Sequence, residues 1–426
     1  MKRKKMYYFF VIIMALYQFP LRFSGYSSVT FLYVYFIPLL YLMWNLSWTI
    51  KFIKKISASL IGISIILYGG LLTLSLAWPF LHGTFEFSFV TEYWRRFFLL
   101  LLKNTFLVAI YEKYFSFSDR KIEEYFKYYV YAMILYIAFT GVLIICKPLR
   151  NVLIGCLYLT KKNKVDLTNP TYYTRFGWAG WSGFDATMLC SLGVCFSCIM
   201  IVIRKNETKQ KNTYLFLIML LLIGNMFYGR TGLVVSLVCI GGVFFSELVK
   251  GHIKFIIPLI ISGFVGVILL LVLKERIPKI NGWFNWAFSA FYNLFTKGQF
   301  RDNTGSVGVL LDRMYWLPSW NTLLVGDGYY NLNDSYYMHT DSGIMRLILY
   351  YGIINYLLGW FAVMFVIQTL IKKMGMLTRK TKMTIWLILV LFIVLFEIKG
   401  ETYYKIVSIL IPIVYLGMQS LSKSEI

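Results

Sequence analysis

Two membrane-length apolar runs that flank Arg230 decide the fold: residues 213–228, TYLFLIMLLLIGNMFY, and residues 229–249, GRTGLVVSLVCIGGVFFSELV. A run of about 20 apolar residues crosses the roughly 30 Å hydrocarbon core of a bilayer. Similar runs recur along the chain. They are continuous rather than alternating in polarity, which favours helices over the strands of a barrel. The sequence therefore predicts an all-α polytopic membrane protein.

The overall composition supports the same class of protein. Of the 426 residues, 59% are hydrophobic and only 15% are charged. The formal net charge of +24 would suggest nucleic acid in a soluble protein, whereas in a membrane protein Lys and Arg mainly fix topology. We therefore expect no nucleic-acid partner. The six cysteines and three histidines show no metal-ligand spacing, so we interpret most of the cysteines as small buried apolar residues.

We predict about 12 transmembrane helices, with boundaries good to several residues. The predicted spans cover residues 6–20, 29–49, 56–79, 95–111, 125–146, 184–203, 213–229, 231–249, 254–273, 342–370, 383–398 and 402–420. Lys and Arg cluster in the short loops of one side, such as 50–55, 204–212 and 371–382. The positive-inside rule then places both termini in the cytoplasm. Residues 1–426 are thus expected to form a single integral membrane domain.

Two long loops fall on the extracytoplasmic side in this topology, residues 147–183 and 274–341. The first is rich in Lys and Arg, which suggests an anionic ligand such as lipid phosphate or pyrophosphate, or simple attraction to anionic headgroups. The second carries an aromatic amphipathic piece, 283–295, of the kind that often lies in the membrane interface. A long polar loop between apolar spans is where extracytoplasmic chemistry would take place.

Several arginines and glycines are candidates for that chemistry. Arg230 joins two spans with almost no loop, so it either extends its side chain to water or binds phosphate oxygens. Arg313 precedes Trp316 by three residues, and both would share a face if the segment were helical. Gly326 and Gly328 flank one residue in a turn suited to positive φ or to close approach of a ligand.

The segment HTDSG, residues 339–343, stands where the second loop re-enters the membrane. His339 could move a proton near neutral pH, and Asp341 could orient it. Thr340 or Asp341 could equally cap the following helix. Arg346 lies near the outer end of that helix, where an arginine can also extend toward water.

Three further residues are candidates for substrate contact. Arg175 and Trp178 belong to an aromatic and glycine-rich stretch, residues 172–185, whose rings could stack on sugars or form an interfacial aromatic belt. Lys103 lies inside the fourth span, where a charge is costly unless it faces a cavity.

Taken in order, these motifs resemble the O-antigen ligase and polymerase family of bacterial polysaccharide assembly. The residues that carry the resemblance are GRTG (229–232), RMYW (313–316), GDG (326–328) and His339. The resemblance covers about residues 180–370. The form HTDSG is more similar to the repeat-unit polymerases (Wzy-type) than to the ligases, which usually show His-Asn.

The resemblance implies a GT-C-like, metal-independent glycosyltransferase that needs no cofactor. Its donor and acceptor would be oligosaccharide repeat units linked to undecaprenyl pyrophosphate, joined into O-antigen, capsule or exopolysaccharide. Arg230 and Arg313 would stabilise the pyrophosphate leaving group, and His339 would deprotonate or orient the acceptor hydroxyl with help from Asp341. The residues expected to bind substrate are Arg175, Arg346, Trp316, Gly326, Gly328, Trp178 and Lys103. The expected partners are the lipid bilayer, a chain-length regulator and a flippase.

Two other functions stay open at this point. A ligase that transfers glycan to a different acceptor differs only in the form of the histidine motif. A flippase for the same lipid-linked glycan is a second alternative, although transporters often show repeated halves and charges at the bilayer midplane. This sequence shows no internal repeat, and most of its polar candidates lie on one side, which favours an enzyme.

Overall fold

The structure is a computed structural model that describes residues 2–24, 27–160, 167, 173–204, 208–249, 251, 278–299, 301, 306–333, 335–375 and 377–421. About 81% of it is helical. Its strands form two short antiparallel pairs. These are β1 (Phe176–Gly177) with β2 (Gly180–Trp181), and β3 (Asn331–Leu332) with β4 (Ser335–Tyr336). The predicted all-α class is confirmed for this part of the chain.

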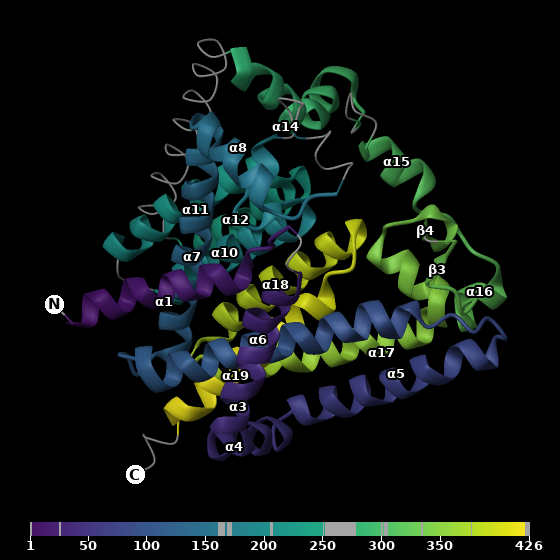
Figure 1. The fold of residues 1–426 in the computed structure, drawn as a ribbon, viewed down its shortest axis with the longest axis horizontal. Coiled ribbons are helices and arrows are strands. Elements are labelled where there is room, and N and C mark those ends of the chain that lie inside the picture. Colours follow the sequence, from purple (N-terminus) through teal and green to yellow (C-terminus); the bar gives the residue numbers. More distant parts are fainter. Residues whose placement is uncertain are drawn as a thin grey trace. The chain divides into compact units, whose positions relative to one another are not determined.

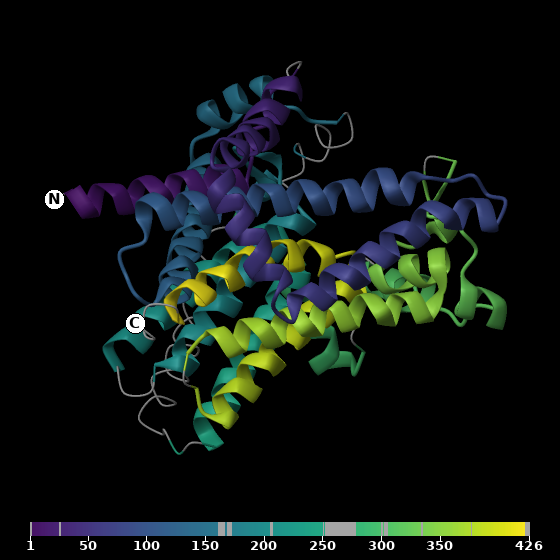
Figure 2. The same ribbon diagram turned by 90° about the horizontal axis from the view of Figure 1, so that it is seen from below.

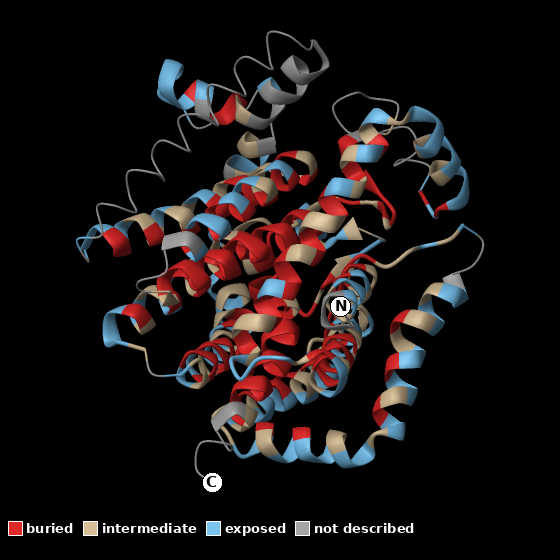
Figure 3. Ribbon diagram, turned by 90° about the vertical axis from the view of Figure 1, so that its left-hand side faces the viewer, coloured by how far each residue is buried: buried red, intermediate tan, exposed pale blue. Residues whose placement is uncertain are grey.

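Seven helices among the described residues are long and apolar enough to cross a membrane. They are α5 (Ile61–Leu81), α7 (Lys121–Ile145), α10 (Phe184–Ile203), α11 (Thr208–Tyr228), α12 (Arg230–Val249), α17 (Gly343–Lys373) and α18 (Arg379–Lys399). Many exposed residues of the helices are large and apolar; Ile66 on α5, for example, is 74% exposed. Figure 3 marks the exposed positions along the helices in pale blue. Long apolar helices with outward apolar faces are the pattern of a polytopic membrane protein.

The predicted spans agree well with the observed helices. With one exception, each predicted span on described residues coincides with a helix to within about five residues. The span predicted at 254–273 lies outside the described residues. The predicted total of about 12 stays a prediction, because seven helices of the described residues, or eight with a bent pair, have the length and composition of a span.

The exception is the span predicted at 29–49 with a loop at 50–55. Here α3 (Ile37–Trp44) is followed at once by α4 (Leu46–Ser57), and the helix axis bends by 94° at Asn45. The Asn45 side chain donates to the carbonyl of Tyr41 at 2.8 Å, a local bond that competes with the regular helix. The predicted loop is therefore wrong: the lysine-rich segment forms a helix that buries Phe52 and Ile56.

The described residues form two compact units. Unit 1 comprises Met1–Val34, Phe126–Val307 and Leu377–Phe392. Besides α10, α11, α12 and most of α7, it holds α1 (Lys2–Gln18), α2 (Ser27–Phe31), α8 (Lys147–Cys156), the short helix η4 (Tyr173–Arg175) and α14 (Pro278–Lys297). The aromatic piece predicted at 283–295 is therefore helical, as part of α14.

Helix α10 is the centre of unit 1 and packs against both α11 and α12 (Figure 1). In its apolar window, 94% of the residues are buried. Polar side chains are matched within this interface: Asn225 Oδ1 accepts hydrogen bonds from Thr187 (3.2 Å) and Ser191 (3.0 Å). A side chain at Gly232 would overlap Thr187, so the glycine permits close helix packing. All six cysteines are free, and the four on α10 and α12 are buried as predicted.

Unit 2 comprises Tyr35–Tyr125, Gly308–Met376 and Ile393–Ile426. Besides α3, α4, α5 and α17, its elements include η2 (Phe89–Trp94), α6 (Arg95–Ile110), η3 (Tyr111–Phe115), α16 (Trp320–Val325), η5 (Tyr337–His339) and α19 (Tyr403–Leu421), together with most of α15 (Ser306–Arg313) and the end of α18. Helix α17 packs along α5 and against α19, and α19 packs against α6 (Figure 2).

Helix α17 is broken inside unit 2. Tyr351 and Gly352 have non-helical backbone angles, and Gly352 has φ +82°. Close to this break, the carbonyls of Leu349 and Tyr350 accept backbone hydrogen bonds from Asp327 (2.7 Å) and from the next residue, Gly328 (3.1 Å). The loop after α16 therefore satisfies backbone groups where the helix is interrupted, which is what a break inside an apolar helix requires.

Candidate functional site

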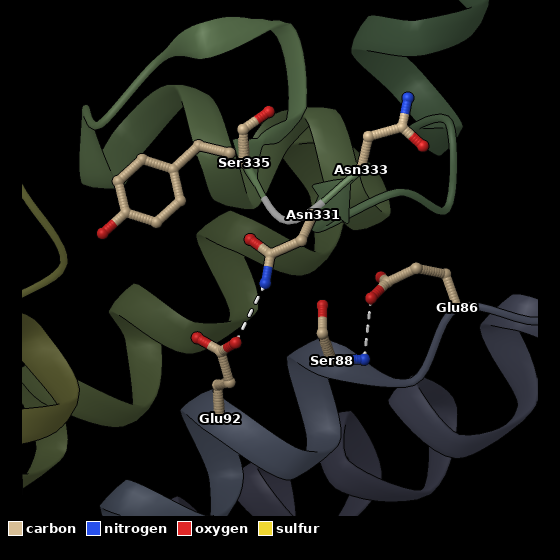
Figure 4. Close-up of a pocket in the computed structure, with 7 residues that line it drawn as sticks. Glu86, Ser88, Glu92, Asn331, Asn333 and Ser335 are labelled. Carbon is tan, nitrogen blue, oxygen red and sulfur yellow. Dashed lines mark hydrogen bonds between the residues drawn. The ribbon is translucent and has the colours of Figure 1, made fainter.

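A pocket of about 710 Å³ opens on unit 2. It is lined by Glu86, Ser88, Glu92, Asn331, Asn333, Ser335 and Tyr336. Figure 4 shows two sides of it: the acidic residues and Ser88 come from η2 and the chain before it, and the asparagines and Ser335 from the β3–β4 hairpin. The side chains of Asn331 and Glu92 point toward one another and are joined by a hydrogen bond of 3.0 Å. This mixture of carboxylate, amide, hydroxyl and aromatic groups offers many hydrogen-bonding positions.

Arg346 is buried next to this pocket and is only 7% exposed. Its guanidinium forms an ion pair with Glu401 at 3.0 Å and donates to Asn331 Oδ1 at 3.2 Å. The rings of Tyr330 and Tyr336 lie against it, with centroids 3.8 and 3.9 Å from its central carbon. A buried arginine needs such partners, since an unpaired charge in a dry interior costs several kcal/mol.

Tyr330 completes this network from the opposite side. Its hydroxyl donates to both Glu401 carboxylate oxygens at 2.6 Å, and its backbone N–H donates to Glu86 at 3.0 Å. Burial raises the pKa of the Tyr330 hydroxyl well above its ordinary value, and the neighbouring Glu401 carboxylate raises it further. Tyr330 therefore remains a hydrogen-bond donor at any physiological pH and links the pocket wall to the buried ion pair.

A second group of polar contacts brings the Arg313 and His339 segments together. The Thr340 hydroxyl donates to the carbonyl of Met314 at 3.2 Å, and the Ser342 hydroxyl donates to Tyr315 at 2.7 Å. Arg313 and His339 are the immediate chain neighbours of these pairs, and both are exposed. We call this group, formed by Met314, Tyr315, Thr340, Asp341, Ser342 and Lys399, the polar corner.

The backbone at His339 is unusual. Both Met338 and His339 have φ of +53°, a region that residues with a side chain seldom adopt. Strained backbone of this kind persists only where the surrounding structure holds it, and it is common at functional sites. Together with its exposure, this geometry is compatible with the proton-transfer role predicted for His339.

Asp341 is engaged differently from the prediction. Its carboxylate pairs with Lys399 Nζ at 3.3 Å, so its observed partner is a lysine at the end of α18 rather than His339. The helix cap is also Ser342, whose hydroxyl accepts from the N–H of Met345, and neither Thr340 nor Asp341. The prediction that Thr340 or Asp341 caps the helix is therefore wrong: the Thr340 hydroxyl donates to the carbonyl of Met314, and Asp341 pairs with Lys399.

The Arg313–Trp316 segment is not one helix. Helix α15 ends at Arg313, and the chain continues without helix or strand to Ser319, with Trp316 partly buried. Pro318 disfavours helical angles in the residue before it. The Tyr315 hydroxyl binds the carbonyl of Ile398 at 2.6 Å, which holds this segment in place. The expectation of a shared helical face is therefore wrong.

The predicted turn at 326–328 has the expected backbone. Gly326 and Gly328 have φ of +81° and +71°. The groups that lie close to this turn belong to the chain itself. A side chain at Gly326 would overlap the backbone of Tyr350, and one at Gly328 would overlap His82. This packing gives both glycines a structural reason, and ligand binding by the turn stays a prediction.

The remaining predicted residues of unit 1 are Arg230, Arg175 and Trp178. Arg230 is the first residue of α12 and is separated from the end of α11 by Gly229 alone, so the two helices are joined with almost no loop, as predicted. The Arg230 guanidinium lies 3.5 Å from the hydroxyl of Ser289 on α14. Arg175 lies over the ring of Trp181 at 5.8 Å. Trp178 is only 9% exposed and donates to the carbonyl of Phe19 at 2.7 Å, so its ring is part of the packing of unit 1.

Arg230 belongs to unit 1, whereas Arg313 and His339 belong to unit 2. The predicted convergence of all three therefore stays a prediction, and the polar corner supports it for two of them. Lys103, on α6 of unit 2, is only 4% exposed and lies in a buried polar stretch with Asn104 and Thr105. This burial agrees with the expectation that the lysine avoids lipid.

Sequence reasoning missed Glu86, Glu92, Asn331, Lys399 and Glu401. One signal was available for the last two: the short polar stretch IKGET, residues 398–402, interrupts two apolar runs. Ionisable residues at such a place are rare and often functional. Glu86 and Glu92 gave no comparable signal, because their contacts with the hairpin residues Tyr330 and Asn331 join segments far apart in the sequence.

Comparisons of the chain with known protein families, with curated proteins and with solved structures find no match. Among the described residues, no group of three or more His, Cys, Asp or Glu side chains could hold a metal ion.

Proposed function

We propose that this chain is a membrane-embedded glycosyltransferase that joins undecaprenyl-pyrophosphate-linked oligosaccharide repeat units into a long surface polysaccharide. In this proposal the chain has about 12 spans and a GT-C-like architecture. It acts at the extracytoplasmic face of the bacterial cytoplasmic membrane, with both termini in the cytoplasm. The motif order noted above suggests the polymerase, and the polytopic helical fold is compatible with a lipid-anchored substrate.

The observation that carries the proposal is the polar corner of unit 2. It ties the chain next to Arg313 to the chain next to His339, although these residues are far apart in the sequence. An exposed guanidinium and an exposed imidazole on joined segments suit a transfer that needs both anion stabilisation and proton removal.

The proposed reaction breaks the bond between the anomeric carbon of the donor glycan and its pyrophosphate oxygen. The acceptor hydroxyl oxygen forms the new bond to that carbon, and its proton passes to His339. The electron pair of the broken bond leaves with the pyrophosphate, whose negative charge Arg313 and Arg230 stabilise. Such interactions accelerate a reaction when they are stronger in the transition state than in the ground state.

The test is reconstitution of the full chain in liposomes with purified undecaprenyl-pyrophosphate-linked repeat unit, followed by gel analysis of the product. The proposal expects a ladder of chain lengths. Loss of the leaving-group arginine in Arg313→Ala or Arg230→Ala should slow the reaction by about 10²–10³. Removal of the base in His339→Ala should slow it by about 10²–10⁴.

Arg120→Ala is the matched control, because Arg120 is a surface arginine of unit 2 whose side chain is 62% exposed and which pairs only loosely with Glu123 at 3.8 Å. It should leave the ladder unchanged. An unaltered ladder in all three site variants would refute the assignment. Transfer of a glycan to a different acceptor, with no ladder, would favour a ligase, and movement of intact lipid-linked glycan across the bilayer without transfer would favour a flippase.

A further inference from the structure

The unit 2 pocket has an unexpected charge for a site that handles lipid pyrophosphate. Of the seven described residues that line it, Glu86 and Glu92 are acidic, and none is Lys, Arg or His. A phosphate group would meet carboxylates here rather than the arginines that usually bind it. The pocket is therefore unsuited to the pyrophosphate end of a lipid-linked glycan.

The two arginines closest to the lining residues are already neutralised. Arg346 is paired with Glu401 at 3.0 Å and is covered by two tyrosine rings. Arg96 pairs with Glu92 at 3.6 Å. The ion pairs offset Arg346 with Glu401 and Arg96 with Glu92. Glu86 is therefore the lining carboxylate without an ion pair among the described residues, and it leaves the pocket with a net negative charge.

Several lining groups are suited to binding the hydroxyl and amide groups of a sugar. The Ser88 hydroxyl oxygen is buried and has no hydrogen-bond partner among the described residues. Asn333 is exposed, with its amide at the hairpin tip (Figure 4), and Tyr336 is 46% exposed. Hydroxyl-rich ligands satisfy such scattered donors and acceptors well.

The pocket also lies close to the proposed base. Tyr336 lines the pocket, and His339 follows it by three residues, which span at most about 11 Å of chain. A sugar held against Tyr336 would therefore be within a short distance of the His339 segment.

From these observations we infer that the unit 2 pocket is the acceptor-sugar subsite, and that it takes an uncharged or amino sugar and excludes an anionic one such as a uronic acid. This inference rests on the proposed function, because "acceptor" has a meaning only for a transferase. The lining supplies hydrogen bonds to hydroxyl groups, and its net negative charge attracts an ammonium group and repels a carboxylate.

The experiment measures binding of three sugars to the full chain in lipid nanodiscs at pH 7 by saturation-transfer NMR. The probes are N-acetylglucosamine, which is neutral, glucosamine, which is cationic, and glucuronate, which is anionic. Binding should be seen for the first two and not for glucuronate. Glu92→Gln should weaken glucosamine by about three- to tenfold, the effect of one unit charge at roughly 6 Å in an open pocket. It should leave N-acetylglucosamine within about twofold, because Gln can still accept the Asn331 hydrogen bond.

Glu112→Gln is the matched control, since Glu112 is a carboxylate of the same unit that pairs with Lys121 at 3.1 Å and does not line the pocket. It should change none of the three affinities. Stronger binding of glucuronate than of the other sugars, binding of none of them, or equal effects of the two variants would each overturn the inference. A normal ladder in the reconstituted reaction alongside any of these results would leave the proposed function standing and remove only the subsite.

Discussion

The buried ion pair between Arg346 and Glu401 allows a quantitative prediction about unit 2. Arg346→Met removes the ion pair at 3.0 Å, the hydrogen bond to Asn331 at 3.2 Å and two ring contacts. Among the described residues, Glu401 then keeps the Tyr330 hydroxyl as its hydrogen-bond donor. Removing one partner of a buried pair destabilises by roughly 3–5 kcal/mol, because the other charge stays buried without compensation.

Glu401→Gln should destabilise by a similar amount, since it strands the arginine while it keeps an oxygen for Tyr330. The double variant, which lacks both charges, should cost less than the sum of the two single changes. We expect a coupling free energy of about 2–3 kcal/mol, within the range found for residues in one ion-pair network.

The assay is thermal unfolding of each variant in one detergent, followed by tryptophan fluorescence. A destabilisation of 3–5 kcal/mol corresponds to a fall in Tm of about 6–20 °C for a unit of this size. Arg313→Met is the control: Arg313 is exposed, so its removal should change stability by no more than about 0.5 kcal/mol. Additive effects of the two single variants would show that the two charges do not depend on each other, and the reasoning would fail.

Three further predictions concern the backbone and the polar corner. Gly352→Ala places a side chain at φ +82° and against the backbone of Leu324 at the end of α16, so it should lower Tm by several degrees. Gly69→Ala, with open space around it, should not, and equal Tm values would contradict this. Ser342→Ala removes the α17 cap and should cost about 1 kcal/mol in the same assay, and a neutral result would show that the cap contributes nothing. The side chains of Asp341 and Lys399 are 40% and 27% exposed, so solvent screens their ion pair. A double-mutant cycle should therefore give a coupling free energy of less than about 1 kcal/mol. A coupling free energy above about 2 kcal/mol would contradict this reasoning.

The sequence predicted the helices well because each depends on local information. An apolar run of membrane length specifies a helix regardless of its neighbours. The junction at Arg230 and the positive φ of Gly326 and Gly328 were also predictable, since both follow from the residues themselves. The bend at Asn45 was missed because a hydropathy pattern does not record a side chain that donates to the backbone carbonyl four residues before it.

The pocket could not be predicted, because its residues meet only through the tertiary fold. Asn331 binds Glu92 across 239 residues of chain, and Arg346 on α17 binds Glu401, which lies between α18 and α19. Asp341 was predicted to orient His339, which lies two residues before it in the sequence. Its observed partner is Lys399, which is distant in sequence. None of these three contacts leaves a periodic or compositional signal in a single sequence.

The network around Tyr330 has a consequence for how the protein is made. Tyr330 binds Glu86, which precedes it by 244 residues, and Glu401, which follows it by 71. Arg346 pairs with Glu401, which follows it in the sequence. The ribosome therefore adds Arg346 to the chain before it adds the carboxylate that neutralises it. Unit 2 can reach its final packing only after residues 393–421 have been synthesised, so its maturation is a late, post-insertion step. Until then the arginine must remain hydrated or bound to another anion, which makes the nascent chain most vulnerable to quality-control proteases during this interval.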